Sequence, residues 1–325
     1  MSRRSKVNLA GVLVLALAAG IGVPTAPGTA ADRITLISTV TRVPNLPLLV
    51  GLRLLEREDQ VTVTIKDVRA SEAAVQAVTD GQGQLGIGFA PFFPAVEKGA
   101  PIVAVMEMSR PEAVIMAKRE IKTPADLNGV RLGSHSPKGS MQVLVETFLK
   151  QHPAVKPNVM FIPEGSPARA QALLQGALDA AVFDLSSADV VRRRSPDGFH
   201  IIADFTSYPV SNSFLIANTE FVKKRPDLVQ KVVTRVLESY RRGLDDPKFW
   251  VREGQSFFKD VPPGVLEEQL RQVAKIFDRD GGLSRLRGEG ARENIAFQVN
   301  AGLLTGPAGK WKPEQFFATE FLEKR

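Results

Sequence analysis

The chain has 325 residues, of which 44% are apolar and 24% are charged, a composition that excludes a disordered or fibrous protein. It contains no cysteine, which excludes a disulfide framework, a thiolate nucleophile, a cysteine-ligated metal cluster and a lipid-bearing cysteine. The 42 lysines and arginines outnumber the 35 aspartates and glutamates, so nucleic acid or an anionic surface has to be considered as a partner. A chain of this length forms two lobes or domains more readily than one.

The first 31 residues have the pattern of a secretory signal peptide. Three basic residues precede an apolar stretch from Leu9 to Val23, and prolines and small residues follow it. We expect export to the periplasm with cleavage near Ala30 or Ala31, as a protein that is not a lipoprotein. The alternative is an uncleaved anchor, but glycine and alanine dilute the stretch, which is short for a span of ~20 residues.

The positive charge is concentrated at the two ends of the chain. Residues 32–218 carry 19 charges of each sign, whereas residues 219–325 carry 20 basic and 16 acidic side chains. No basic stripe with interleaved aromatic residues is present, so we expect no nucleic-acid partner. The dense run Arg192–Arg194 follows an apolar stretch and is interpreted as cations at a helix C-terminus, with a docking patch as the alternative.

Residues 33–108 alternate short apolar runs with helical patterns. Strands are expected at 33–38, 60–68, 85–89 and 101–108, and helices at 44–58, 71–80 and 91–98. This βαβαβ order predicts a parallel sheet with helices on its faces.

The pattern restarts after Thr123, which precedes a proline and has an acid three residues further on, as at a helix N-terminus. Strands are expected at 130–134, 158–162, 180–183 and 199–205, and helices at 139–151, at 167–175 and up to about 193. Five further helices are expected in a C-terminal tail, at 226–243, 247–258, 263–277, 292–303 and 313–323. The tail is too apolar to stand alone and should pack on one of the α/β units.

The recognised catalytic and cofactor motifs are absent or out of place. Residues 81–86 match the string GxGxxG, but a helix precedes it and a strand overlaps its end, so it is interpreted as a helix-to-strand turn. There is no phosphate-binding P-loop, no GxSxG elbow and no histidine spacing typical of a metal site. We therefore expect no catalytic residue, no metal and no cofactor.

The stretch from Ser134 to Ser140 (SHSPKGS) joins the end of a strand to the start of a helix. Free backbone N–H groups, hydroxyls and a cation in such a junction suit an oxyanion or a carboxylate. An ordinary N-cap loop explains the same residue types equally well. Arg42 and Arg110 follow other strands and could clamp an anion in a bidentate manner, although a solvated surface arginine is the alternative for each.

Four segments resemble the periplasmic substrate-binding proteins of ABC importers, in the nitrate, sulfonate, taurine and thiamine-precursor group. They are residues 44–47 (PNLP), 79–101 (TDGQGQLGIGFAPFFPAVEKGAP), 121–140 (IKTPADLNGVRLGSHSPKGS) and 172–184 (ALLQGALDAAVFD) followed by 214–239. The resemblance implies a two-lobed type II periplasmic-binding-protein fold in which each lobe is a mostly parallel sheet flanked by helices. Lobe 1 would comprise residues 32–107 and 207–325, with the helical tail, and lobe 2 residues 108–206.

The resemblance places a ligand in the cleft between the lobes. Lobe 1 and the crossing would contribute Ser38, Thr39, Thr41, Arg42, Asn45, Phe89, Ala90 and Arg110, and lobe 2 would contribute Ser134, Ser136, Gly139, Ser140 and Asp184. Asp184 would receive an amine or amide donor, or repel a bare anion.

The resulting hypothesis is a monomeric extracytoplasmic solute-binding protein that closes by a hinge motion and docks on a membrane permease. The expected ligand is a small anion of the sulfonate, nitrate or carboxylate kind. Two alternatives remain open: a sensor-type ligand-binding protein, or an enzyme on the same fold that acts on a pyrimidine or menaquinone precursor.

Overall fold

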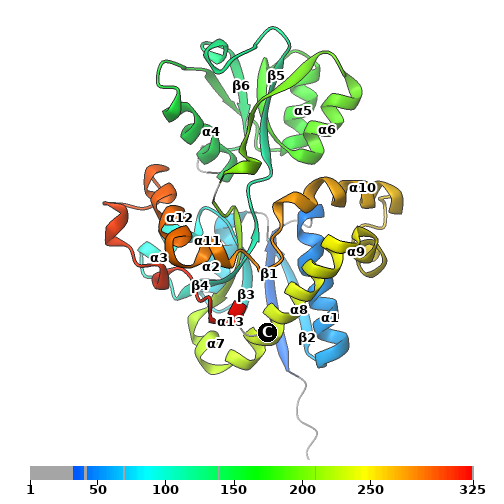
Figure 1. Cartoon of the computed structure of the whole chain (residues 1–325), viewed down its shortest axis with the longest axis vertical. Coiled ribbons are helices and arrows are strands. Elements are labelled where there is room, and N and C mark those ends of the chain that lie inside the picture. Colours follow the sequence, from blue (N-terminus) through cyan, green and yellow to red (C-terminus); the bar gives the residue numbers. More distant parts are fainter. Residues whose placement is uncertain (1–31, 40–41, 69, 138, 209, 324–325) are drawn as a thin grey trace, which may run out of the picture. The chain divides into compact units, whose positions relative to one another are not determined.

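The computed structural model describes residues 32–39, 42–68, 70–137, 139–208 and 210–323, so the expected export signal lies outside the described residues. Two five-stranded sheets with helices on their faces make up this part of the chain, as predicted (Figure 1). We call the two sheets sheet A and sheet B.

Sheet A has the strand order β2–β1–β3–β10–β4, and only β10 among its strands runs antiparallel to its neighbours. Its strands are β1 (Arg33–Thr39), β2 (Thr62–Val68), β3 (Leu85–Gly88), β4 (Ile102–Ser109) and β10 (Ser213–Asn218). Sheet B has the order β7–β6–β8–β5–β9 and repeats this arrangement with β5 as the antiparallel strand. Its strands are β5 (Ala113–Lys118), β6 (Arg131–Ser134), β7 (Asn158–Phe161), β8 (Ala180–Asp184) and β9 (Phe199–Asp204).

The strands β5 and β10 are absent from the sequence-based prediction. Both follow a crossing of the chain from one sheet to the other: β4 ends at Ser109 and β5 begins at Ala113, while β9 ends at Asp204 and β10 begins at Ser213. Each crossing leaves the carboxyl end of one strand and enters the other sheet at the carboxyl edge of its parallel strands. The strand that follows therefore runs antiparallel to them. Five of the six residues in each of β5 and β10 are fully buried, so neither strand shows the period-two alternation that identifies a half-buried strand.

Helices cover both faces of each sheet (Figure 1). In the first half these are α1 (Leu46–Asp59), α2 (Ser71–Thr79), α3 (Phe92–Glu97), α4 (Ser140–Gln151), α5 (Ser166–Leu174) and α6 (Leu185–Arg194). The later ones are α7 (Thr219–Lys224), α8 (Pro226–Asp245), α9 (Pro247–Gly254), α10 (Pro263–Val273), α11 (Leu283–Leu286), α12 (Gly288–Asn300) and α13 (Glu320–Glu323). The Arg192–Arg194 run ends α6, and residues 80–83 form the helix-to-strand turn, so both interpretations are confirmed.

The tail packs on sheet A through α8, whose buried residues run along the whole helix and contact α1, α9, α13 and β4. The helices α1 and α8 approach so closely at Gly51 that a Cβ atom there would lie 2.6 Å from the Cα of Val236. In a second close contact, the indole of Trp250 in α9 packs against Gly243 in α8. The glycines are therefore needed for packing, because any side chain at these positions would force the helices apart.

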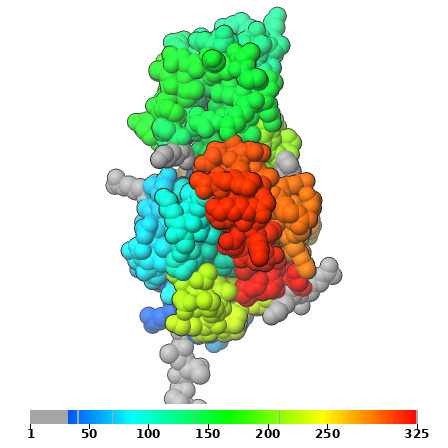
Figure 2. Space-filling view, turned by 90° about the vertical axis from the view of Figure 1, so that its left-hand side faces the viewer, coloured from blue at the N-terminus to red at the C-terminus, as the bar shows by residue number. Residues whose placement is uncertain are grey.

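The end of the tail differs from the prediction of a helix over residues 313–323. Only α13 forms there as an α-helix, because the backbone around Phe317 bridges to β4 instead. Ala104 donates its N–H to the carbonyl oxygen of Phe316 at 2.8 Å and accepts from the N–H of Ala318 at 2.9 Å. Figure 2 shows the orange and red part of the chain beside its cyan part, with the orange-red segment directly below the green part.

Candidate functional site

Strand ends from both sheets meet where the chain crosses between them. The connection from β4 to β5 is only three residues long, so the carboxyl edge of sheet A faces the edge of sheet B at which β5 begins. In an open α/β sheet the loops at the carboxyl ends of the strands carry the ligand. The predicted site residues belong to such loops, and we describe them from sheet A to sheet B.

Arg42 reaches across from sheet A to the crossing. Its Nη1 donates to Oε1 of Glu112 at 3.1 Å, and its guanidinium lies 6.0 Å from the centre of the Phe89 ring. The arginine side chain is 39% exposed, whereas that of Glu112 is 6% exposed. Arg42 and Phe89 were predicted for the site; Glu112 was not, because it lies in a short connection with no local motif.

Glu112 is a buried carboxyl group beside a second acid. The β5–β8 ladder pairs Asp184 with Ala113, the residue after Glu112, and the Asp184 charge is close enough to act on the Glu112 carboxyl. Burial raises the pKa of Glu112 to about 7; Arg42 lowers it and the charge of Asp184 raises it further. Asp184 also caps α6, because its Oδ1 accepts from the N–H of Ser187 at 2.8 Å.

A buried guanidinium lies behind the edge of sheet B. Arg169 is 1% exposed and donates to the carbonyl oxygens of Val182 at 2.9 Å and Ile162 at 3.1 Å, and to Oγ of Ser166 at 2.8 Å. Burial lowers the pKa of Arg169 to about 10, and the charge of Asp184 opposes this change. Within the described residues no carboxylate pairs with it directly, so it contributes positive potential to this end of the sheet.

The junction between β6 and α4 leaves several polar groups unsatisfied. Ser134 is fully buried, and its Oγ has no hydrogen-bond partner in the described structure; Nδ1 of the neighbouring His135 has none either. Burial and the charge of Arg169 lower the pKa of His135, which keeps its ring neutral near pH 7. Gly139 occupies the N-cap position and offers no side chain to the first N–H groups of α4, which begins at Ser140. Ser136 is half-buried and accepts from the N–H of Gly139 at 3.2 Å.

In the corresponding part of sheet A, Asn45 is 3% exposed and its Nδ2 has no partner among the described residues. Ser38 is also buried, but its Oγ donates locally to the carbonyl oxygen of Thr39 at 2.7 Å. Thr39 itself is half-buried, and Thr41 lies outside the described residues. The unsatisfied Asn45 amide is therefore a donor that this loop can offer to a ligand, besides the guanidinium of Arg42.

Arg110 is turned toward the tail and away from the other predicted residues. Its Nη1 donates to the carbonyl oxygen of Thr206 at 3.4 Å and its Nη2 to that of Lys275, and its Nε lies 3.9 Å from Oδ1 of Asp278. This arginine therefore fastens the crossing to the tail. We leave it out of the site proposed below.

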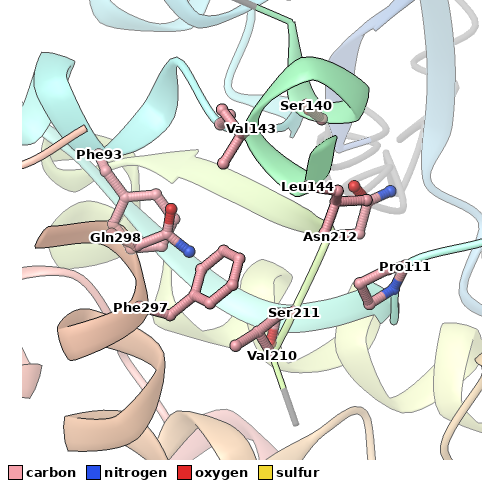
Figure 3. A pocket seen from close by; sticks show the side chains of 11 residues that line it. Phe93, Pro111, Ser140, Val143, Leu144, Val210, Ser211, Asn212, Phe297 and Gln298 are labelled. Carbon is pink, nitrogen blue, oxygen red and sulfur yellow. The ribbon is translucent and has the colours of Figure 1, made fainter. Parts of the chain in front are cut away.

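A small pocket with a cavity volume of about 20 Å³ adjoins the start of α4 (Figure 3). Predicted residues Ala90 and Ser140 line it, together with Phe93, Pro111, Val143, Leu144, Val210, Ser211, Asn212, Phe297 and Gln298. Sequence reasoning missed its far wall, because Phe297 and Gln298 belong to α12 in the tail, which was expected only to pack.

The described residues contain no group of three or more His, Cys, Asp or Glu side chains placed to hold a metal ion. They also contain no helix that is both long enough and apolar enough to cross a membrane.

Comparison with known proteins gives a family and a fold. The family model described as NMT1/THI5 like matches residues 57–249. Comparison with curated proteins finds no match.

Among solved structures, the periplasmic aliphatic sulphonate binding protein of Escherichia coli has a TM-score of 0.66 at 19% identity, covering 84% of this chain and 92% of its own. A putative periplasmic sulfonate-binding protein from Methylobacillus flagellatus has a TM-score of 0.65 at 18% identity, covering 90% and 93%. The periplasmic nitrate-binding protein of Synechocystis has a TM-score of 0.65 at 8% identity, covering 90% and 87%. These likenesses confirm the two-lobed periplasmic-binding-protein fold.

Proposed function

Because the chain belongs to the NMT1/THI5-like family, we propose that it is the solute-binding component of an ABC-type importer. It works outside the cytoplasm after loss of an export signal within residues 1–31, captures a small anion, and delivers it to a membrane permease as a monomer. Lobe 1 (residues 32–107 and 207–325) and lobe 2 (residues 108–206) close on the ligand by a hinge motion at the two crossings.

One observation carries this proposal: buried hydrogen-bond donors without partners follow strand ends in both sheets, at the edges that the two crossings join. They are Nδ2 of Asn45 and Oγ of Ser134, beside the uncapped N-terminus of α4. A buried donor that stays unsatisfied costs about 1–3 kcal/mol, so native proteins rarely keep one unless a ligand or water satisfies it. A ligand with several acceptor oxygens would satisfy all of these groups together.

The chemistry of these donors favours an anion. The first turn of α4 presents N–H groups at the positive end of a helix dipole, and Arg42 can offer a second, charged donor from sheet A. The structurally similar sulfonate-binding and nitrate-binding proteins bind ligands of this kind. The residues we assign to the site are Ser38, Thr39, Arg42, Asn45, Phe89, Ala90, Ser134, Ser136, Gly139, Ser140 and Asp184.

The proposal is tested by thermal shift and titration calorimetry on the purified protein with nitrate, alkanesulfonates, carboxylates and pyrimidines. A true ligand at a hundredfold excess over its Kd stabilises the fold by about 2.7 kcal/mol. Absence of a shift with every anion, or turnover of one of the compounds, contradicts the proposal; turnover would indicate an enzyme on this fold.

A pair of glycine variants locates the site. Gly139→Asp adds a carboxylate at the start of α4, which should weaken anion binding at least tenfold through charge repulsion. Gly264→Asp makes the same change at the start of α10, where a Cβ atom meets nothing within 4 Å, and should leave binding unchanged. Equal affinity of the two variants would exclude the α4 terminus as the anion site.

A further inference from the structure

The two crossings are fastened to the tail at their sheet A ends. The N–H of Glu107, in β4, donates to the carbonyl oxygen of Gly281 at 2.8 Å. The buried carboxylate of Glu107 accepts from Oγ of Ser211, in the second crossing, and from Nε of Arg285 at 2.8 Å. Oγ of Ser211 in turn accepts from Nδ2 of Asn294, in α12, at 3.0 Å. These parts of both crossings therefore move with sheet A and the tail.

Arg110, in the first crossing, is held by the same part of the tail. Its N–H donates to the carbonyl oxygen of Ile276 at 2.9 Å, and its Nη2 donates to that of Lys275. Its Nε lies 3.9 Å from Oδ1 of Asp278. The backbone and the guanidinium of Arg110 are thus both fixed on the tail side of the crossing.

Thr206, in the second crossing, is fastened instead to sheet B. Its N–H donates at 2.8 Å to Oδ1 of Asp204, the last residue of β9, and its neighbour Phe205 is fully buried in the core of sheet B. Nη1 of Arg110 donates to the carbonyl oxygen of Thr206 at 3.4 Å. This hydrogen bond joins the sheet A side of one crossing to the sheet B side of the other, so a bend at the crossings has to change it.

The guanidinium of Arg110 is incompletely satisfied in this arrangement. Its bond to Thr206 is longer than the roughly 2.7–3.2 Å typical of N–H···O bonds, and its Nε is buried without a partner among the described residues. Oδ2 of Asp278 accepts from Arg285, whereas Oδ1 faces Nε at 3.9 Å, about 1 Å beyond hydrogen-bond reach. Release of Thr206 would let Arg110 exchange a long bond to a carbonyl for a bond between opposite charges.

We propose that Arg110 is a positioning residue of the hinge with two alternative partners. In the structure it bonds to Thr206 across the crossings; when the sheets rotate about the crossings, this bond breaks and Nε pairs with Asp278. The inference rests on the proposed function because it takes the two crossings as the hinge. The exchange of partners favours the rotated arrangement about threefold to tenfold. Arg110 thereby biases the balance between the two arrangements without contacting the ligand.

The distance between the two lobes, measured without ligand, tests this inference. The chain contains no cysteine, so two introduced cysteines can carry spin labels at defined places. Gln171→Cys lies on α5, which packs on sheet B, and Lys224→Cys lies on α7, which packs on sheet A (Figure 1). Both positions are exposed. Double electron–electron resonance then gives the populations of the arrangement in the structure and of the rotated one.

Variants that remove the Arg110–Asp278 pair should return the population to the arrangement in the structure. Arg110→Met and Asp278→Asn should each raise the ratio of this arrangement to the rotated one about threefold to tenfold. In the double variant the second change should add nothing to the first, because the pair is already lost. Arg279 belongs to the same loop but pairs with Asp245 in the tail, so Arg279→Met should leave the ratio unchanged.

A lysine variant covers the case in which Arg110→Met fails to fold. Arg110→Lys keeps the positive charge but has no Nε, so it should shift the ratio in the same direction, with a circular dichroism spectrum and Tm like those of the parent. The inference is overturned by unchanged distances in the Arg110 variants, by a shift toward the rotated arrangement, or by additive effects in the double variant. Titration of the parent with nitrate, methanesulfonate and acetate tests the proposed function separately: failure of all three to bind contradicts that function, whereas the distances decide the hinge inference.

Discussion

Glu112 provides a test of the electrostatics at the crossing, through the substitution Glu112→Gln. Glutamine has the shape of the protonated acid and cannot ionise, so it removes the cost of holding a charge in this buried position. Because the folded-state pKa is raised from 4.5 to about 7, the folded protein binds more protons than the unfolded chain between these values. The stability of the parent protein should therefore fall, through this group, as the pH rises from about 4.5 to 7.

The size of the effect follows from the shift in the pKa of Glu112. A change in pKa from 4.5 to about 7 is equivalent to about 3 kcal/mol, reached above pH 7 and absent below pH 4.5. For a chain of this size, 1 kcal/mol changes Tm by about 2 °C, so the variant should exceed the parent by about 6 °C at pH 8 but by only about 2 °C at pH 5.

Thermal unfolding at half-unit steps from pH 5 to pH 8 measures this difference, with Glu164→Gln, an exposed glutamate in the same lobe, as the control. The control should follow the parent at every pH. The reasoning is refuted if the difference between Glu112→Gln and the parent is constant with pH. It is also refuted if the variant becomes the less stable protein at pH 8, which would mean that the ion pair with Arg42 outweighs the cost of burial.

Three further changes test the packing and the ion pairs. Gly243→Ala should destabilise the fold by roughly 2 kcal/mol or more in urea titrations, because the new Cβ would lie 1.9 Å from the Trp250 ring, whereas Gly264→Ala should be neutral or slightly stabilising. Asp179→Asn should cost roughly 2 kcal/mol at pH 7 and progressively less as the pH falls below about 4: Arg131 and Lys118 hold the pKa of Asp179 well below its usual range, so its contribution decreases as the pH falls toward that lowered value. Tyr240→Phe should cost roughly 1 kcal/mol in the same titrations, since it removes only the hydrogen bond from the buried hydroxyl to the carbonyl oxygen of Met108.

The sequence predicts those parts of the fold in which local pattern and burial agree. Strands with turn residues at their ends, and helices with an apolar stripe such as α8, were placed within a few residues. The crossing strands β5 and β10 were not predicted, because they are buried on both faces and carry no turn signal that separates them from their surroundings. The prediction of a helix over residues 313–323 fails for another reason: the pairing of Ala104 with Phe317 is a tertiary contact that overrides local helix preference.

The same distinction applies to the site. The junction from Ser134 to Ser140 could be predicted because its residue types and its place between a strand and a helix are both local. Glu112 could not, because it acquires its role from Arg42, 70 residues away, and from a strand that was itself missed. The α12 wall of the pocket could not either, since in sequence its residues read as an ordinary amphipathic helix.

The charges around the junction also explain why the ligand has to be recognised by directed hydrogen bonds. Arg42 pairs with Glu112, and the charge of Asp184 acts on both Glu112 and Arg169, so the two acids offset part of the positive charge of the two arginines. Net attraction of an anion is therefore reduced, and selectivity has to come from donors that are fixed in place and otherwise unsatisfied. Without a ligand, Arg42 donates one hydrogen bond to Glu112. An anion that binds this guanidinium would compete with the Glu112 carboxylate, whose charged form is already disfavoured by burial. Proton uptake by Glu112 would relieve that competition, which links capture of the anion to the protonation of an acid in the connection between the two sheets.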